Sequence, residues 1–442
     1  MITSMRFKVQ KIILLVVSIF IIAFWLYILN ITSFANLFTL LGLFILLFAS
    51  KSNPELLPIS LVIIETRLFG VGPEKIFGVL PEKIELLILI FSYILWAMRK
   101  FNKRNQIPKS YLLLLYTVFV VISSAIMARI TVGQSILIGI LLQTRLLVIL
   151  SIFPIVSLMN FEPLSYKRLW ILIKKIAIIQ SLVNILQLLL YPSVQFLTIT
   201  SENLRFGSIR ITYGYVLIAI ALMMTFSEIL NQVDKKNIFY FLIYSFDLLF
   251  VCKTRMVVFG LLVSIFIAFI LSLRKKDGWR RALILIGFFA LITPVFSSRV
   301  SELFALTQQE VSTNTGNYVA RTGEVEFYTS QVKDPILGRG FISPKTKGGE
   351  IFDTKHGYYS LTDIGIIALY VISGVVGLIW FFILIVILIE RLKKSKFNIF
   401  GLEYLVYSVV TCMTLLSSYY QSEYLILSLI LLAAPKIAEE EV

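Results

Sequence analysis

Long apolar runs separated by short polar stretches form the main pattern of this chain. A membrane-spanning helix needs about 20 predominantly apolar residues. The run at 56–72 is the weakest because it holds Glu65 and Arg67, and the last two runs can form one broken hairpin. The pattern therefore predicts an all-α, polytopic transmembrane helical bundle of 12 to 14 spans. The apolar runs cover residues 12–31, 34–50, 56–72, 84–98, 111–129, 135–158, 169–190, 213–230, 238–252, 256–273, 282–297, 362–389, 401–418 and 420–435.

One long hydrophilic stretch, residues 298–361, interrupts this pattern. Apolar spacing predicts short helices over 299–310 and 319–332, and the Asp334-Pro335 and Gly338-Arg339-Gly340 sequences predict a turn after them. Residues 343–353 are polar and are expected to be mobile. A long loop with its own helices is usually functional. We therefore expect three regions: an N-terminal transmembrane bundle over 1–297, this loop over 298–361, and C-terminal transmembrane helices over 362–442.

Composition and charge agree with a membrane protein and add an orientation. The 442 residues are 58% hydrophobic, with a formal net charge of +16. Such a charge can indicate nucleic-acid binding, but here Lys and Arg cluster in short loops between apolar runs, which is the positive-inside signature of cytoplasmic loops. We therefore expect membrane lipids and no nucleic acid as partners, both termini in the cytoplasm, and an extracytoplasmic 298–361 loop. The clusters are Arg99-Lys100, Lys103-Arg104, Lys167-Arg168, Arg274-Lys275-Lys276, Arg280-Arg281 and Arg391 to Lys396.

His356 is the one histidine of the chain, and it lies near the end of the hydrophilic stretch, just before an apolar run. Its side chain can take and give a proton near neutral pH. A lone histidine in such a place is more often a structural residue at the membrane interface, so position alone favours that interpretation. Cys252 and Cys412 form neither a disulfide framework nor a metal-binding spacing, so no metal site is expected.

Cations at predicted outer positions are a second candidate feature. Arg205 and Arg210 lie in a short outer loop, Lys253 and Arg255 lie at the outer end of a span, and Arg321 lies in the large loop. Each of them alone is most simply an interfacial cation. Together they run against the positive-inside rule, and a guanidinium matches phosphate oxygens with a planar, bidentate fork. The set suggests a site for a phosphate-bearing lipid.

Arg145 is a separate case because it lies inside an apolar run. A charge at the centre of a bilayer costs about 2.5–3.5 kcal/mol on insertion scales. We therefore expect Arg145 to face a polar cavity or a partner.

Four stretches occur in a fixed order between residues 205 and 375 and resemble the motifs of one protein family, the O-antigen ligase and O-antigen polymerase superfamily of bacterial envelope proteins. The third and fourth are similar to the family patterns hPllGxG and HNxYL…ExGIIG. Gly357 stands where the family usually has Asn, and the first 200 residues match only as hydrophobic spans. The stretches are Arg205-Phe206-Gly207-Ser208, Thr254-Arg255, Arg321 followed by Asp334 to Gly340, and His356-Gly357-Tyr358-Tyr359 with Asp363 to Ile367.

The resemblance implies a GT-C-like membrane glycosyltransferase that needs no metal or other cofactor. Such an enzyme moves a glycan from undecaprenyl diphosphate to a hydroxyl on the outer face of the bacterial inner membrane. Arg205, Arg210 and Arg255 would hold the diphosphate, His356 would activate the acceptor hydroxyl, and Arg321 would orient the loop or a second phosphate.

Further residues enter as candidates on the same basis. Lys253, Arg339 and Tyr359 would bind substrate, and Arg145 is either structural or lines the cavity. Three carboxylates are near enough in sequence to orient His356 or replace it, namely Glu324, Glu326 and Asp363.

Several activities fit the resemblance. A polymerase would extend one lipid-linked repeat unit with another, whereas a ligase would pass the glycan to lipid A core. We favour the polymerase because the ligase-like Asn after the histidine is missing. A polysaccharide flippase or other transporter is the non-enzyme alternative, although the repeat-related halves of many transporters are absent from the sequence. The expected partners are the undecaprenyl-diphosphate-linked oligosaccharide and, for a polymerase, a chain-length regulator.

Overall fold

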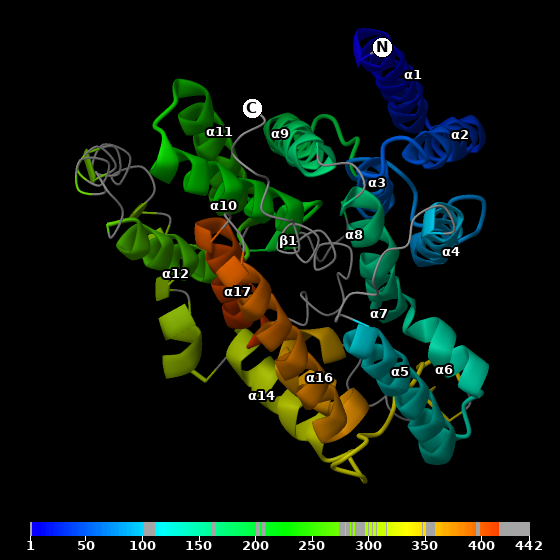
Figure 1. Cartoon of the computed structure of the whole chain (residues 1–442). Coiled ribbons are helices and arrows are strands. Elements are labelled where there is room, and N and C mark those ends of the chain that lie inside the picture. Colours follow the sequence, from blue (N-terminus) through cyan, green and yellow to red (C-terminus); the bar gives the residue numbers. More distant parts are fainter. Residues whose placement is uncertain are drawn as a thin grey trace. The chain divides into compact units, whose positions relative to one another are not determined.

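The computed structural model describes residues 2–100, 111–160, 164–199, 204–205, 208–273, 279, 283, 286–287, 297–298, 300–302, 304–305, 307–314, 316–346, 348–350, 359–394 and 398–414. These residues are helical almost throughout (Figure 1), which confirms the all-α class. The chain divides into two compact units, and each is described by itself. Unit 1 contains residues 1–106 and 151–221, and unit 2 contains residues 107–150 and 222–436.

Unit 1 is built from apolar helices that pack largely in chain order. Helix α1 packs on α2, α2 on α3, and α3 on both α4 and α9. Between α3 and α9, the buried Glu55 forms an ion pair with Arg168, with 2.5 Å between Oε1 and Nε. The elements are α1 (Ile2–Ile28), α2 (Thr32–Ser50), α3 (Leu56–Glu65), α4 (Pro81–Lys100), α8 (Ile152–Asn160), α9 (Ser165–Leu190), the hairpin strands β1 (Leu204–Arg205) and β2 (Ser208–Ile209), and the start of α10 (Tyr215–Asn231).

Unit 2 holds the helices around the predicted loop. Helix α5 packs on α6 and α16, α12 packs on α17, and α14 packs on α16. Trp380 of α16 is fully buried and donates its indole N–H to Thr117 of α5 at 2.8 Å. The elements are α5 (Tyr111–Val132), α6 (Ile136–Leu142), α7 (Thr144–Val148), η1 (Ile149–Ser151, which ends at the border with unit 1), the rest of α10, α11 (Lys235–Phe246), the π-helical turn η3 (Asp247–Cys252), α12 (Arg255–Ser272), α14 (Gly316–Thr329), η4 (Leu361–Ile364), α16 (Ile366–Lys394) and α17 (Asn398–Cys412).

Helices long and apolar enough to cross a membrane occur in both units, so the chain has the features of a membrane protein. Among the described residues five qualify, at Thr32–Ser50, Leu113–Val132, Ser165–Leu190, Arg255–Ser272 and Ile366–Glu390. Shorter apolar helices coincide with other predicted runs. The predicted runs at 282–297 and 420–435 lie largely or wholly outside the described residues, so the number of 12 to 14 spans stays a prediction.

The run at 135–158, predicted as one apolar segment, is divided in the structure into α6, α7, η1 and α8. The division begins at Gln143, whose side-chain amide donates to the backbone carbonyls of Gly139 at 3.0 Å and Val121 at 3.1 Å. A polar side chain that bonds to backbone competes with the helical hydrogen bonds. Apolar content alone did not indicate this break.

The described part of the predicted loop is ordered and contains the predicted helices. Residues 300–302, 304–305 and 307–312 are helical, and α14 covers most of the second predicted helix. The expectation of mobility is wrong for the beginning of the 343–353 stretch. Ser343 is buried and its N–H donates to the side chain of Gln134 at 2.9 Å, and the Gln134 amide donates to the Phe341 carbonyl at 2.9 Å.

The turn that follows α14 fills a break in helix α16. Gly374 interrupts α16 with φ 60° and ψ −153°, and the turn pairs with the backbone on both sides of it. The N–H groups of Val375 and Val376 donate to Pro335 and Ile336 at 3.0 and 3.1 Å. Those of Arg339 and Gly340 donate to Val371 and Ile372 at 2.8 and 3.0 Å. Unpaired backbone groups inside a membrane are costly, so the turn stabilises a helix that could not be broken there on its own.

The same turn lies directly against α5, and Gly340 makes this approach possible. A Cβ atom at Gly340 would lie 2.5 Å from the carbonyl oxygen of Ser124 and closer still to the amide nitrogen of Ala128. The residue also has φ +89°, where side chains are strained. The turn is thereby held between two candidate membrane-spanning helices, α5 and α16.

Candidate functional site

Arg255 begins helix α12, and the chain before it has unusual geometry. The π-helical turn η3 precedes it, and Lys253 adopts the left-handed conformation with φ 53°. Such turns occur often at functional sites. A cation in the first turn of a helix is disfavoured by the helix dipole, which is positive at that end. Arg255 at this position therefore needs an anion nearby.

The anion is Glu310, which lies on the helical segment before α14. Arg255 Nη2 lies 2.7 Å from Glu310 Oε1, and Nη1 lies 3.2 Å from Oε2. Nη1 also donates to the hydroxyl of Thr307 at 2.9 Å. We call residues 300–312, as far as the structure describes them, the strap. The Arg255 and Glu310 side chains are 23% and 15% exposed, so this bidentate pair lies at the edge of the solvent.

Helix α12 has two faces with different roles. Gly260 lies against α17, where a Cβ atom would be 2.9 Å from the methyl group of Thr411. At about 100° per residue, Arg255, Phe259 and Leu262 share the opposite face. That face is not covered by α17, and Phe259 is 40% exposed there.

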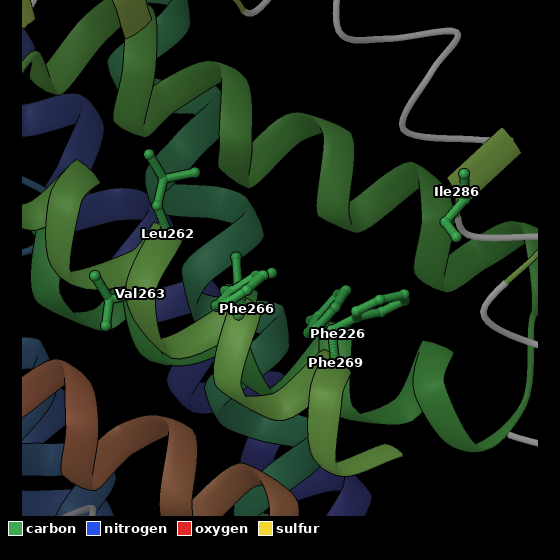
Figure 2. A pocket seen from close by; sticks show the side chains of 7 residues that line it. Phe226, Leu262, Val263, Phe266, Phe269 and Ile286 are labelled. Atoms are coloured by element: carbon green, nitrogen blue, oxygen red, sulfur yellow. The ribbon is translucent and has the colours of Figure 1, made fainter. Parts of the chain in front are cut away.

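An apolar groove of about 740 Å³ continues along this open face (Figure 2). It is lined by Leu262, Phe266 and Phe269 of α12 together with Phe226 of α10 and Ile286. At 1.5 Å per residue, the groove begins about 10 Å along the helix from Arg255 and reaches about 21 Å. A guanidinium at the helix start is thus followed by an apolar channel on the same face.

A second cluster is formed where α14 holds the chain after residue 358. The Tyr328 hydroxyl donates to the Tyr359 carbonyl at 3.1 Å, and the Ser360 N–H donates to Glu324 Oε1 at 3.1 Å. The rings of Tyr359 and Phe327 lie 5.6 Å apart. Three side chains from two neighbouring turns of one helix therefore fix the end of the predicted motif at 356–359 and the residue after it.

Glu324 is the most unusual group of this cluster. It is 3% exposed, and its second oxygen, Oε2, is buried without a hydrogen-bond partner in the described part of the chain. Burial raises the pKa of the Glu324 carboxyl; the Ser360 N–H and Arg321 oppose this shift, and Asp363 adds to it. A buried carboxyl group with a raised pKa is a candidate for proton transfer.

Arg339 has a packing role in this structure. Its side chain is 4% exposed, its guanidinium stacks over the ring of Tyr328 at 5.1 Å, and it donates to Gln331. This arrangement braces the C-terminal part of α14 against the turn that fills α16. The side chain of Arg321 is half-buried on the same helix, one turn before Glu324.

The remaining predicted site residues lie in unit 1 or have side chains outside the described part of the chain. Arg205 lies in β1, where its backbone pairs with Ser208, but its side chain lies outside the described residues. Arg210 follows β2 and is partly buried. The side chain of Arg145 and the whole of His356 also lie outside the described residues.

Within unit 2 the structure therefore gives two clusters of predicted residues. One contains Arg255 and Lys253, and the other contains Arg321 of α14 with Arg339 and Tyr359, which contact α14. Sequence reasoning missed Glu310 and the strap contact altogether. In a loop with balanced charges, the sequence does not show which acidic residue pairs with Arg255. The one available signal is the position of Arg255 at a helix start, where a cation is unfavourable unless an anion lies nearby.

No group of three or more His, Cys, Asp or Glu side chains in the described part of the chain is placed to hold a metal ion. No protein-family model matches the chain, and neither a curated protein nor a solved structure matches it.

Proposed function

We propose that the protein is a metal-independent membrane glycosyltransferase of the polysaccharide polymerase type. It transfers a glycan from undecaprenyl diphosphate to a hydroxyl of a second lipid-linked repeat unit, on the outer face of the bacterial inner membrane. The ordered motifs of the sequence suggest this class, and the geometry of α12 supports a lipid substrate with an anionic head group.

The observation that carries the proposal is the shared face of α12. Arg255 provides a guanidinium at the positive end of the helix, and the apolar groove follows it along the same face. A diphosphate bonds well to such a fork, and a prenyl chain is chemically suited to a groove lined by Phe and Leu (Figure 2). A lipid with both parts is recognised along one helix.

The proposed reaction is a displacement at the anomeric carbon. The acceptor oxygen forms the new bond to this carbon while the bond to the diphosphate oxygen breaks. His356 takes the proton of the acceptor hydroxyl, and Arg255 stabilises the charge that develops on undecaprenyl diphosphate. Removing one donor that stabilises the developing charge typically lowers the rate by about 10²–10³-fold.

Helix α14 supports the proposal by holding the chain that follows the histidine. Tyr359 and Ser360 stand three and four positions after His356 and are bound by Tyr328 and Glu324. A catalytic group is effective only when the structure around it holds it in place. The α14 contacts provide such support on one side of the motif.

The test is a transfer assay with the full-length protein in nanodiscs and undecaprenyl-diphosphate-linked repeat units. We expect a ladder of longer glycans from the native chain. Arg255→Ala and His356→Ala should lower the initial rate at least about 100-fold. Arg129→Ala is the matched control, because Arg129 is an exposed arginine at the end of another candidate membrane-spanning helix, α5.

The outcomes separate the alternatives. A ladder of native strength from His356→Ala excludes the base role, and one from Arg255→Ala excludes the diphosphate role. Transfer that requires added lipid A core identifies a ligase. Movement of lipid-linked glycan across a sealed bilayer without chain growth identifies a flippase.

A further inference from the structure

We propose that the strap is an autoinhibitory lid, in which the carboxylate of Glu310 occupies the guanidinium of Arg255 until a phosphate-bearing ligand displaces it. This inference rests on the proposed function for the identity of the natural ligand. The displacement itself concerns only described residues and can be tested without any transfer reaction.

The two anions compete for the same atoms. Both terminal nitrogens of Arg255 face the two oxygens of Glu310, at 2.7 and 3.2 Å. A phosphate binds an arginine through the same pair of parallel N–H groups. A bidentate phosphate and the Glu310 carboxylate therefore exclude one another, and an intramolecular carboxylate raises the ligand concentration needed to fill the site.

The described side chains of the strap lie mostly at the surface, so its release is feasible. Its described side chains are exposed except for those of Val300 and Glu310, which are partly buried, and Phe304 is 45% exposed. Besides the Arg255 contacts, Phe304 meets Phe259 of α12 edge-to-face, with ring centroids 6.2 Å apart. Segments with few buried contacts open at low free-energy cost.

The position of the strap makes the contact inhibitory rather than merely structural. Phe259 lies between Arg255 and Leu262 on the open face of α12, and Phe304 contacts it there edge-to-face. The strap thus stands over the path from the guanidinium to the apolar groove. A ligand whose head group binds Arg255 and whose chain enters the groove meets both strap contacts.

The first experiment measures binding of inorganic pyrophosphate to the full-length protein in detergent by calorimetry. We expect Glu310→Gln, which keeps the shape and removes the charge, to bind about two- to tenfold more tightly than the native chain, the range expected for a partly exposed ion pair. Glu302→Gln makes the same charge change at an exposed strap position and should leave the affinity unchanged. Arg255→Gln should abolish the gain when it is combined with Glu310→Gln.

A second readout follows the strap directly. An environment-sensitive fluorophore at Gln308→Cys, an exposed strap position, should change its emission when the strap is released. Pyrophosphate tests a free phosphate, and nanodiscs with phosphatidylglycerol in place of phosphatidylcholine test a lipid head group. The arm that responds identifies the source of the displacing group, and Arg255→Gln should remove the response.

The lid is refuted if Glu310→Gln binds pyrophosphate no more tightly than the native chain, or if neither chain binds it. Weaker binding by Glu310→Gln would show that Glu310 positions Arg255 instead of competing with its ligand. A tighter Glu310→Gln variant without any transfer activity would support the lid and count against the proposed function. Native transfer activity without tighter pyrophosphate binding by Glu310→Gln would refute the lid and leave the proposed function supported.

Discussion

The contact of Gly340 with α5 allows a sharp test of how the turn is held. Gly340→Ala places a methyl group against the backbone of α5, 2.5 Å from the Ser124 oxygen. Backbone cannot move aside as a side chain can, so the turn has to leave α5. Gly133→Ala is the matched control, because Gly133 directly follows α5 with φ +70° and an added Cβ atom there meets nothing within 4 Å.

The magnitude follows from the bonds that the turn would lose. Both substitutions cost about 1–2 kcal/mol for an alanine at positive φ. Gly340→Ala also endangers three hydrogen bonds: Gly340 N–H to Ile372, Phe341 N–H to the Ser124 hydroxyl, and the Thr131 hydroxyl to Arg339, each 3.0 Å long. At about 0.5–1.5 kcal/mol per bond, Gly340→Ala should lower the free energy of unfolding by about 2–4 kcal/mol more than Gly133→Ala.

The assay is thermal unfolding of the purified variants in one detergent, followed by tryptophan fluorescence and by retention of the monodisperse peak in gel filtration. We expect the midpoint of Gly340→Ala to fall roughly 2–4 °C below that of Gly133→Ala. Equal midpoints would refute the reasoning, because the backbone conformation would then explain the whole cost and the close approach to α5 none of it.

Three other predictions use the same unfolding assay. Glu324→Gln should flatten the pH dependence of stability: the raised pKa of Glu324 means that its contribution is full below the ordinary carboxyl pKa of 4.5 and is lost as the pH rises through the raised pKa. Arg168→Ala should cost about 1–3 kcal/mol, because it leaves the buried carboxylate of Glu55 without its ion pair. Gly260→Ala should cost about 1–3 kcal/mol by overpacking α12 against α17, and Thr411→Ser, which removes the nearest methyl group, should recover part of that loss.

Each of these has a distinguishing control. A Glu324→Gln variant with the native pH dependence would show that another group titrates. Lys167→Ala, the exposed neighbour of Arg168, should change stability by less than about 0.5 kcal/mol. If Thr411→Ser destabilises the Gly260→Ala variant further, the two residues do not compete for the same space.

Much of the fold could be predicted because apolar runs report directly on helices that need about 20 such residues to cross a membrane. The predicted runs at 34–50, 111–129 and 256–273 agree closely with α2, α5 and α12. The pattern could not show the breaks at Gln143 and Gly374. Those depend on side-chain and loop hydrogen bonds from distant residues, which hydropathy does not record.

The sequence indicated individual residues of the candidate site but not which residues contact one another. Arg255 was noticeable as a cation at a predicted outer position. The sequence around Gly338 and Gly340 predicted a turn. The carboxylate that pairs with Arg255 comes from 55 residues later in the chain. The partner of the turn, the interrupted backbone of α16, lies inside an apolar run that looks continuous in the sequence.

The filled break in α16 has a consequence for any exchange of parts between related chains. The turn at 335–340 completes the hydrogen bonding of a membrane helix, and Gly374 leaves room for that turn: a Cβ atom there would lie 2.7 Å from the amide nitrogen of Gly338. The turn and α16 therefore have to be exchanged together. A chimera that transplants residues 316–350 without the matching α16 would leave a helix with its backbone open in mid-span, and such proteins should be removed by quality control before they reach a functional state.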